Sequence, residues 1–91
     1  MTTTHDTTAN DKDPLQGLTL ERLLARLVKL YGWAELARLI PVRCFSNDPG
    51  MKSSLTFLRR TPWARQKVEE LYVAYGHQDW LASGFTDGPI S

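Results

Sequence analysis

The sequence predicts an all-α fold, a compact four-helix domain, from three observations. Apolar residues recur at helical spacing between residues 18 and 75. Typical helix-starting residues stand before these stretches, and glycine or proline follows most of them. A chain of 91 residues has room for one small domain and little more.

Residues 18–31 are predicted to form the first helix. Thr19 is a suitable N-cap, and Glu21 lies in the first turn, where the helix dipole favours negative charge. At about 100° per residue, one side collects the apolar residues Leu20, Leu23, Leu24, Leu27, Leu30 and Tyr31. The other side carries Glu21, Arg22, Ala25, Arg26 and Lys29. Gly32 follows at the position where a left-handed residue commonly ends a helix.

The second helix is expected over residues 33–40 and is shorter. Its apolar stripe contains Trp33, Leu36, Ala37 and Ile40, and Pro41 stops it. A loop of residues 41–48 follows, in which Cys44 and Phe45 are expected to plug the core. We also expect Trp33 and Trp63 to belong to that core.

Two more helices are predicted from paired starting signals. Asp48-Pro49 places an N-cap and a first-turn proline before a third helix that runs to Arg59 or Arg60. Thr61-Pro62 repeats the signal, so the third and fourth helices should meet at a sharp corner. The fourth helix is expected to bury Ala64, Val68, Leu71 and Tyr75 and to end at Gly76.

The expected organisation is a disordered tail at 1–14, a four-helix domain at 15–76 and an irregular C-terminal segment at 77–91. The first segment is rich in threonine and has little apolar surface. In the last segment Trp80, Leu81 and Phe85 are expected to dock on the core, with a contact surface as the alternative. The arrangement resembles a helix-turn-helix, but the loop between the second and third helices is longer than the usual three or four residues.

Several classes of protein are not expected. Cys44 is the only cysteine, so an internal disulfide and a cysteine zinc cluster are excluded. No apolar run approaches the roughly 20 residues of a spanning helix, and the chain starts without a secretory pattern, which favours a cytoplasmic location. Outside the tail the only histidine is His77, without a catalytic or metal-ligating arrangement. We therefore expect no enzyme, no cofactor, no metal and no small-molecule substrate.

The net charge of +1 conceals an uneven distribution. Residues 19–75 carry a net charge of +5, whereas the segments before and after carry −2 each. One hypothesis is that these acidic ends compete with a nucleic acid, such as DNA, for the cations of residues 19–75. The folded body is thus compatible with a nucleic-acid partner.

The cations of the third helix share its outer face. Met51, Leu55 and Leu58 are expected to face the core, and the opposite side carries cations and hydroxyls without a carboxylate. Lys and Arg neutralise phosphates, while Ser and Thr donate to phosphate oxygens. The candidate DNA-binding residues are Lys52, Ser53, Thr56, Arg59, Arg60, Arg65 and Lys67. The alternative is an ordinary solvated face, in which Arg65 pairs with Glu69.

Three stretches of the chain resemble a small bacterial domain family. They are DPLQGLTLE at 13–21, LYGWAEL at 30–36 and MKSSLTFLRRTPWAR at 51–65, the last followed by KVEELY at 67–72. The family was long catalogued as a conserved domain of unknown function, and its Vibrio member was described as a double-stranded-DNA-binding protein with a four-helix motif. The resemblance covers residues 13–75 and implies an all-α four-helix fold that binds duplex DNA without catalysis or a cofactor. It carries over no residue-level contacts, and the tails lie outside it.

Two functions remain after these exclusions. The first is a module that binds double-stranded DNA through phosphate contacts, associated with the nucleoid. The second is a small helical protein-interaction module that uses Trp63, Trp80 and Phe85. A domain of about 60 ordered residues has a marginal core, so a homodimer is a further possibility.

Overall fold

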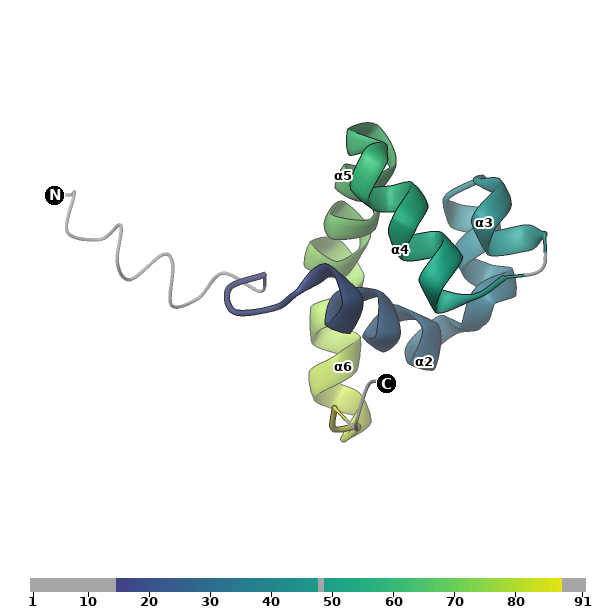
Figure 1. The fold of residues 1–91 in the computed structure, drawn as a ribbon. Coiled ribbons are helices and arrows are strands. Elements are labelled where there is room, and N and C mark those ends of the chain that lie inside the picture. Colours follow the sequence, from purple (N-terminus) through teal and green to yellow (C-terminus); the bar gives the residue numbers. More distant parts are fainter. Residues whose placement is uncertain (1–14, 48, 88–91) are drawn as a thin grey trace, which may run out of the picture.

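The computed structural model describes residues 15–47 and 49–87, which contain helices and no strand. The elements are α2 (Leu20–Leu39), α3 (Arg43–Ser46), α4 (Met51–Arg60), α5 (Pro62–Leu71), the π-helical turn η1 (Tyr72–Gly76) and α6 (His77–Ser83). In Figure 1, α5, η1 and α6 form one continuous column, α2 crosses it, and α4 lies beside α5. The prediction of an all-α four-helix fold is confirmed. The predicted tail at 1–14 and the predicted cap Asp48 lie outside the described residues.

Helix α2 combines the first two predicted helices. Its start is capped as expected, because the backbone N–H of Arg22 donates to Thr19 Oγ1 at 3.2 Å. Gly32 breaks the helix with φ 84° and ψ 162°, which separates a first arm before it from a second arm after it. The predicted break is confirmed, although the ψ of Gly32 is extended rather than that of an ordinary left-handed cap.

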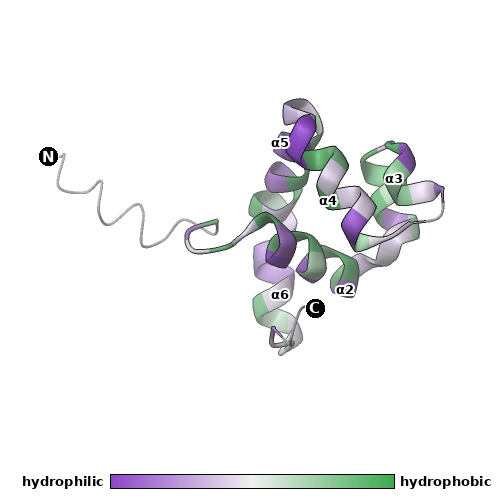
Figure 2. Ribbon diagram, viewed as in Figure 1, coloured by the Kyte–Doolittle hydropathy of each residue, from purple (hydrophilic) through white to green (hydrophobic). Residues whose placement is uncertain are grey.

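The core lies between the arms of α2 and the other helices. Its buried apolar members are Leu23, Leu24, Leu27, Leu36, Ile40, Val42, Phe45, Leu55, Leu58, Ala64, Val68 and Tyr72. Figure 2 shows strongly hydrophilic residues at the end of the molecule where α4 meets α5. The stripes predicted for the first three helices are confirmed, with Leu20, Leu30, Tyr31, Trp33, Ala37 and Met51 partly buried at their edges.

The predicted loop at 41–48 contains the one-turn helix α3. Phe45 is buried and its ring lies 5.7 Å from that of Trp33, which confirms the core plug. Cys44 is partly buried, and its carbonyl accepts a hydrogen bond of 3.1 Å from the buried Ser54 Oγ of α4. This bond ties α3 to α4.

Helix α4 begins later than expected and ends at the expected corner. Gly50 is its N-cap with extended backbone, and its carbonyl accepts the first helical hydrogen bond, so the prediction that Pro49 opens the helix is wrong. Thr61 alone separates α4 from α5. Its carbonyl accepts from the N–H groups of Ala64 and Arg65, and Pro62 occupies the first turn, which confirms the second starting signal.

The predicted end of the fourth helix at Gly76 is wrong, because the chain continues through η1 into α6. Tyr72 is buried four residues after the buried Val68, and Tyr75 in the π turn is exposed, contrary to the predicted stripe. Gly76 itself has helical φ and ψ. A Cβ there would lie 2.9 Å from Leu27 Cδ2 and from Tyr72 Cδ1, so the glycine serves close packing rather than helix termination.

Residues 77–83 form α6 rather than irregular structure, since only Gly84, with φ 78° and ψ 3°, ends the column. Trp80 docks on the protein as expected and is buried, whereas Leu81 is 68% exposed. Phe85 is 40% exposed, and its ring centroid lies 5.7 Å from that of Trp80. Trp63 is not part of the core, contrary to expectation.

Two of the glycines with positive φ, Gly32 and Gly84, should respond differently to asparagine. Gly32 occupies a region that is essentially restricted to glycine, so Gly32→Asn should lower the free energy of unfolding by about 1–3 kcal/mol. Gly84 occupies the left-handed helical region that asparagine tolerates, so Gly84→Asn should change the free energy of unfolding by less than about 0.5 kcal/mol. An added Cβ meets no atom within 4 Å at either site, so urea denaturation compares the backbones alone. Equal losses would contradict this explanation of the break in α2.

Candidate nucleic-acid interface

Four of the predicted DNA-binding residues line one open hollow on the outer face of α4. The hollow measures about 760 Å³ and is bordered by Pro49, Gly50, Met51, Lys52, Ser53, Thr56, Phe57 and Arg60. Lys52, Ser53, Thr56 and Arg60 are exposed there. They come together because Leu55 and Leu58 on the opposite side of α4 are buried in the core.

The start of α4 adds unpaired donors to the same hollow. Gly50 offers no side-chain cap, and the first helical hydrogen bond is donated by Ser54. The preceding N–H groups of the first turn therefore lack a helical partner and attract anions, as does the positive end of the helix dipole. Ser53 Oγ donates to Gly50 O at 3.4 Å and Thr56 Oγ1 to Lys52 O at 3.0 Å. These hydroxyls must rotate before they can donate to a phosphate.

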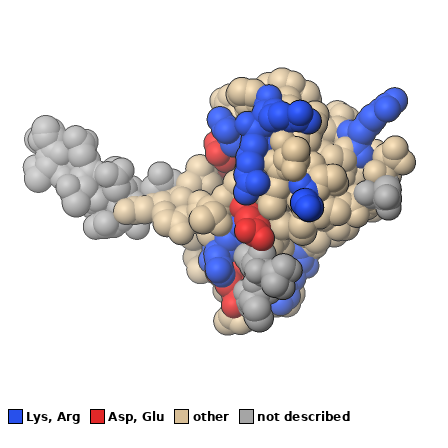
Figure 3. All heavy atoms as spheres, in the orientation of Figure 1, with Lys and Arg blue, Asp and Glu red and all other residues tan. Residues whose placement is uncertain are grey.

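The other predicted residues lie outside the hollow. Arg59 is exposed in the last turn of α4, Lys67 is exposed on α5, and Arg65 is half-buried there. Figure 3 shows Lys and Arg side chains gathered over the part of the surface where α4 meets α5. The basic surface thus consists of the α4 hollow and of three further cations near the junction of α4 and α5, namely Arg59, Arg65 and Lys67.

No ion pair within the described residues neutralises the five cations of this basic surface. The ion pairs found there join Arg22 and Arg26 to Asp87 and Arg38 to Glu35. The alternative pairing of Arg65 with Glu69 is not formed, and Glu70 accepts a hydrogen bond from Gln66 instead. The helix dipole accounts for part of the preference for Arg59 and Arg60 at the end of α4. It does not account for Lys52 at the start, where the dipole disfavours a cation.

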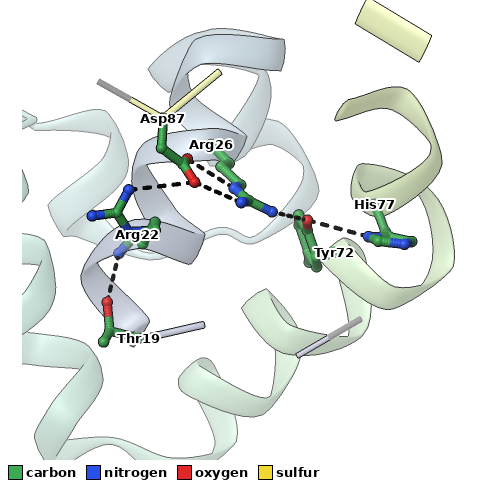
Figure 4. A network of polar contacts seen from close by, with 6 residues as sticks. All are labelled: Thr19, Arg22, Arg26, Tyr72, His77 and Asp87. Atoms are coloured by element: carbon green, nitrogen blue, oxygen red, sulfur yellow. Dashed lines mark hydrogen bonds and ion pairs between the residues drawn. The ribbon is translucent and has the colours of Figure 1, made fainter. Parts of the chain in front are cut away.

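A polar network that the sequence did not predict joins α2 to η1, α6 and Asp87 (Figure 4). Arg26 donates to both carboxylate oxygens of Asp87, at 2.9 and 2.6 Å, and to Tyr72 Oη at 2.6 Å. Arg22 lies 3.3 Å from the same carboxylate, and Tyr72 Oη is 3.4 Å from His77 Nδ1. Arg26 was expected on the solvent side of its helix, yet its side chain is only 18% exposed. The available signal was the spacing of Arg22 and Arg26, which places both on one side of α2 next to the leucines.

The acidic groups described in the C-terminal segment are engaged by α2. Hydrogen bonds from Arg26 hold the pKa of Asp87 below its ordinary value. Tyr31 donates to Asp79, and burial together with this bond raises the pKa of the Tyr31 hydroxyl. Both carboxylates thus have partners on α2, and competition of the acidic ends with DNA remains a prediction.

Three further properties concern the described part of the chain only. No three His, Cys, Asp or Glu side chains come together there as a group that could hold a metal ion. Burial raises the pKa of the Cys44 thiol, which favours its protonated form. Among these residues no helix combines the length and apolar character needed to cross a membrane.

The Asp87 network should stabilise the protein in a pH-dependent way. Because the folded state lowers the pKa of Asp87 from 3.8, its contribution is complete at neutral pH and is lost as the pH falls through the folded pKa. Asp87→Asn should therefore lower the free energy of unfolding by about 1 kcal/mol or less at pH 7, the range for partly exposed pairs. Urea denaturation should show this difference vanishing in acid, once the pH is below the lowered pKa of Asp87. A difference of equal size at both pH values would contradict the assignment.

Comparison with known proteins identifies the family of the chain. No curated protein matches the chain. The model of the family described as DNA-binding protein VF530 matches residues 11–73, which include α2, α3, α4, α5 and all seven predicted DNA-binding residues. That match spans more than half of the chain, and the chain belongs to the DNA-binding protein VF530 family.

Proposed function

We propose that this protein binds double-stranded DNA, mainly through phosphate contacts from the outer face of α4 and the start of α5. One observation carries the proposal: within a chain of a DNA-binding family, the cations of α4 and α5 lie without ion-pair partners among the described residues, around a hollow at a helix start. The proposal includes no catalysis and no cofactor. A location at the nucleoid in the cytoplasm follows from the partner.

The dimensions of the basic surface suit a duplex. Lys52 and Arg60 are eight residues apart on α4, which is about 12 Å along the helix axis. A duplex carries one negative charge per roughly 1.7 Å, so this length spans about seven phosphate charges. The three cations of α4 can therefore each find a phosphate, and Arg65 and Lys67 of α5 extend the surface beyond this length.

The mode of docking is expected to differ from that of a helix-turn-helix. Residues 40–50, including α3, separate the second arm of α2 from α4, whereas a recognition helix normally follows a turn of three or four residues. We propose that the corner between α4 and α5 straddles the phosphate backbone. Arg59 or Arg60 then lies nearest to a base edge.

Part of the surface expected for the alternative function, protein interaction, is covered in the folded protein. Trp80 is buried against the protein, and Phe85 packs on it with Lys29 Nζ 4.9 Å from the ring centroid. The exposed apolar residues that remain on η1 and α6 are Val73, Tyr75 and Leu81. Binding through these would depend weakly on salt, which separates this function from phosphate recognition. A homodimer formed through the same residues is tested by sedimentation.

The salt dependence of DNA affinity tests the proposal directly. Five phosphate contacts predict a log–log slope of affinity against salt of about −4.5, from about −0.9 per contact. The double variant Arg59→Ala/Arg60→Ala should bind more weakly and reduce the magnitude of the slope by about 2. Fluorescence anisotropy of a labelled duplex at several salt concentrations measures both quantities.

A matched double variant controls for net charge. Lys29→Ala/Arg38→Ala also removes two cations, but both lie on α2. It should leave the slope nearly unchanged. A slope that responds equally to both double variants, or to neither, would contradict the assignment to α4 and α5.

A further inference from the structure

One large apolar side chain is exposed within the basic surface. Trp63 is 56% exposed and belongs neither to the core cluster nor to the hydrophobic residues that pack on it. The other two tryptophans are covered, since Trp80 is buried and Trp33 is partly buried against Phe45. An indole left largely in water at a defined position is informative, because tryptophan usually occupies cores or contact sites.

The backbone holds Trp63 rigidly beside the cations. It is the second residue of α5 and follows Pro62, whose ring restricts the preceding backbone. Arg60 is three residues earlier, so the two Cα atoms are within about 11 Å. Lys67 is four residues later on the same helix, where side chains at this spacing are neighbours. Trp63 therefore lies at the corner of α4 and α5, with Lys67 one turn later on α5 and Arg60 three residues before it.

The chemistry around Trp63 favours a nucleobase over an apolar protein partner. No cation is stacked on its ring in the described structure, in contrast to Arg26 on Trp80 and Lys29 on Phe85, and 56% of its surface is exposed. The first acidic residues after it on α5 are Glu69 and Glu70, more than one turn away. Flat π-faces next to phosphate-binding cations are the combination with which proteins hold nucleic-acid bases.

We propose that the Trp63 indole stacks against a nucleobase of the bound DNA, while the surrounding cations hold the phosphates. The inference rests on the proposed function, which it extends from the backbone to the bases. In a duplex the ring enters at a base step that it partly unstacks, as apolar wedges do. The contact is independent of sequence, because every base has a π-face.

The test compares Trp63→Ala with the wild type on a duplex of about 20 base pairs, two helical turns. The affinity should fall by at least about fivefold, the lower range for loss of one stacked base. The slope against salt should remain that of the wild type, because no phosphate contact is removed. Trp63→Phe should retain most of the affinity, and DNA should quench a fraction of the wild-type tryptophan fluorescence that is absent in this variant.

Tyr75→Ala is the matched control, since Tyr75 is an exposed aromatic residue on η1, about 18 Å further along the same helical column. It should leave the affinity unchanged, and thermal melting confirms that both variants fold. Unchanged affinity in Trp63→Ala, with steep salt dependence preserved, would overturn the stacking contact and leave the proposed function intact. A weakened affinity with a flattened slope would also overturn it, because Trp63 would then act by positioning cations. A wild type that binds no duplex would overturn the proposed function itself.

Discussion

Burial of the first arm of α2 is the constraint on which the rest of the structure depends. Leu24 and Leu27 are completely buried, and α2 contacts α3, α4, η1 and α6. Each of these elements must turn its apolar side towards α2, since the chain has no second core among the described residues. For α4 this fixes the direction of Leu55 and Leu58. The cations on its other side then face the solvent as a consequence of packing rather than of any contact between them.

The same constraint explains the close contact at the opposite side of α2. The column of α5, η1 and α6 approaches α2 so closely that Gly76 has no room for a side chain beside Leu27. The π turn places the buried Tyr72 at this contact, and its hydroxyl accepts a hydrogen bond from Arg26. Because Arg26 also binds Asp87, the described segment after α6, residues 84–87, is connected to α2. The protein thereby separates an internally neutralised side from a side with unneutralised cations.

Local patterns in the sequence were sufficient for most of the helices and for the grouping of Lys52, Ser53, Thr56 and Arg60. These features depend on spacing along one helix and on caps such as Thr19 and Thr61. Both are determined by residues that are close together in the sequence. The errors arose where distant residues decide. Gly76 resembles a helix end in isolation, and only its contact with Leu27 of α2 explains it. Arg26 and Asp87 are 61 residues apart, and the exposure of Trp63 depends on how α5 leaves the corner, so neither could be obtained from periodicity.

The central claim is that the basic surface of α4 and α5, with Trp63 at its corner, is where the protein meets DNA. Titration of the ¹⁵N-labelled protein with a short duplex, followed by NMR, tests it residue by residue. We expect the largest shifts at the backbone amides from Met51 to Arg60 and at the indole N–H of Trp63, with the amides of α6 little changed. Shifts confined to α6 and the first arm of α2 would contradict the claim.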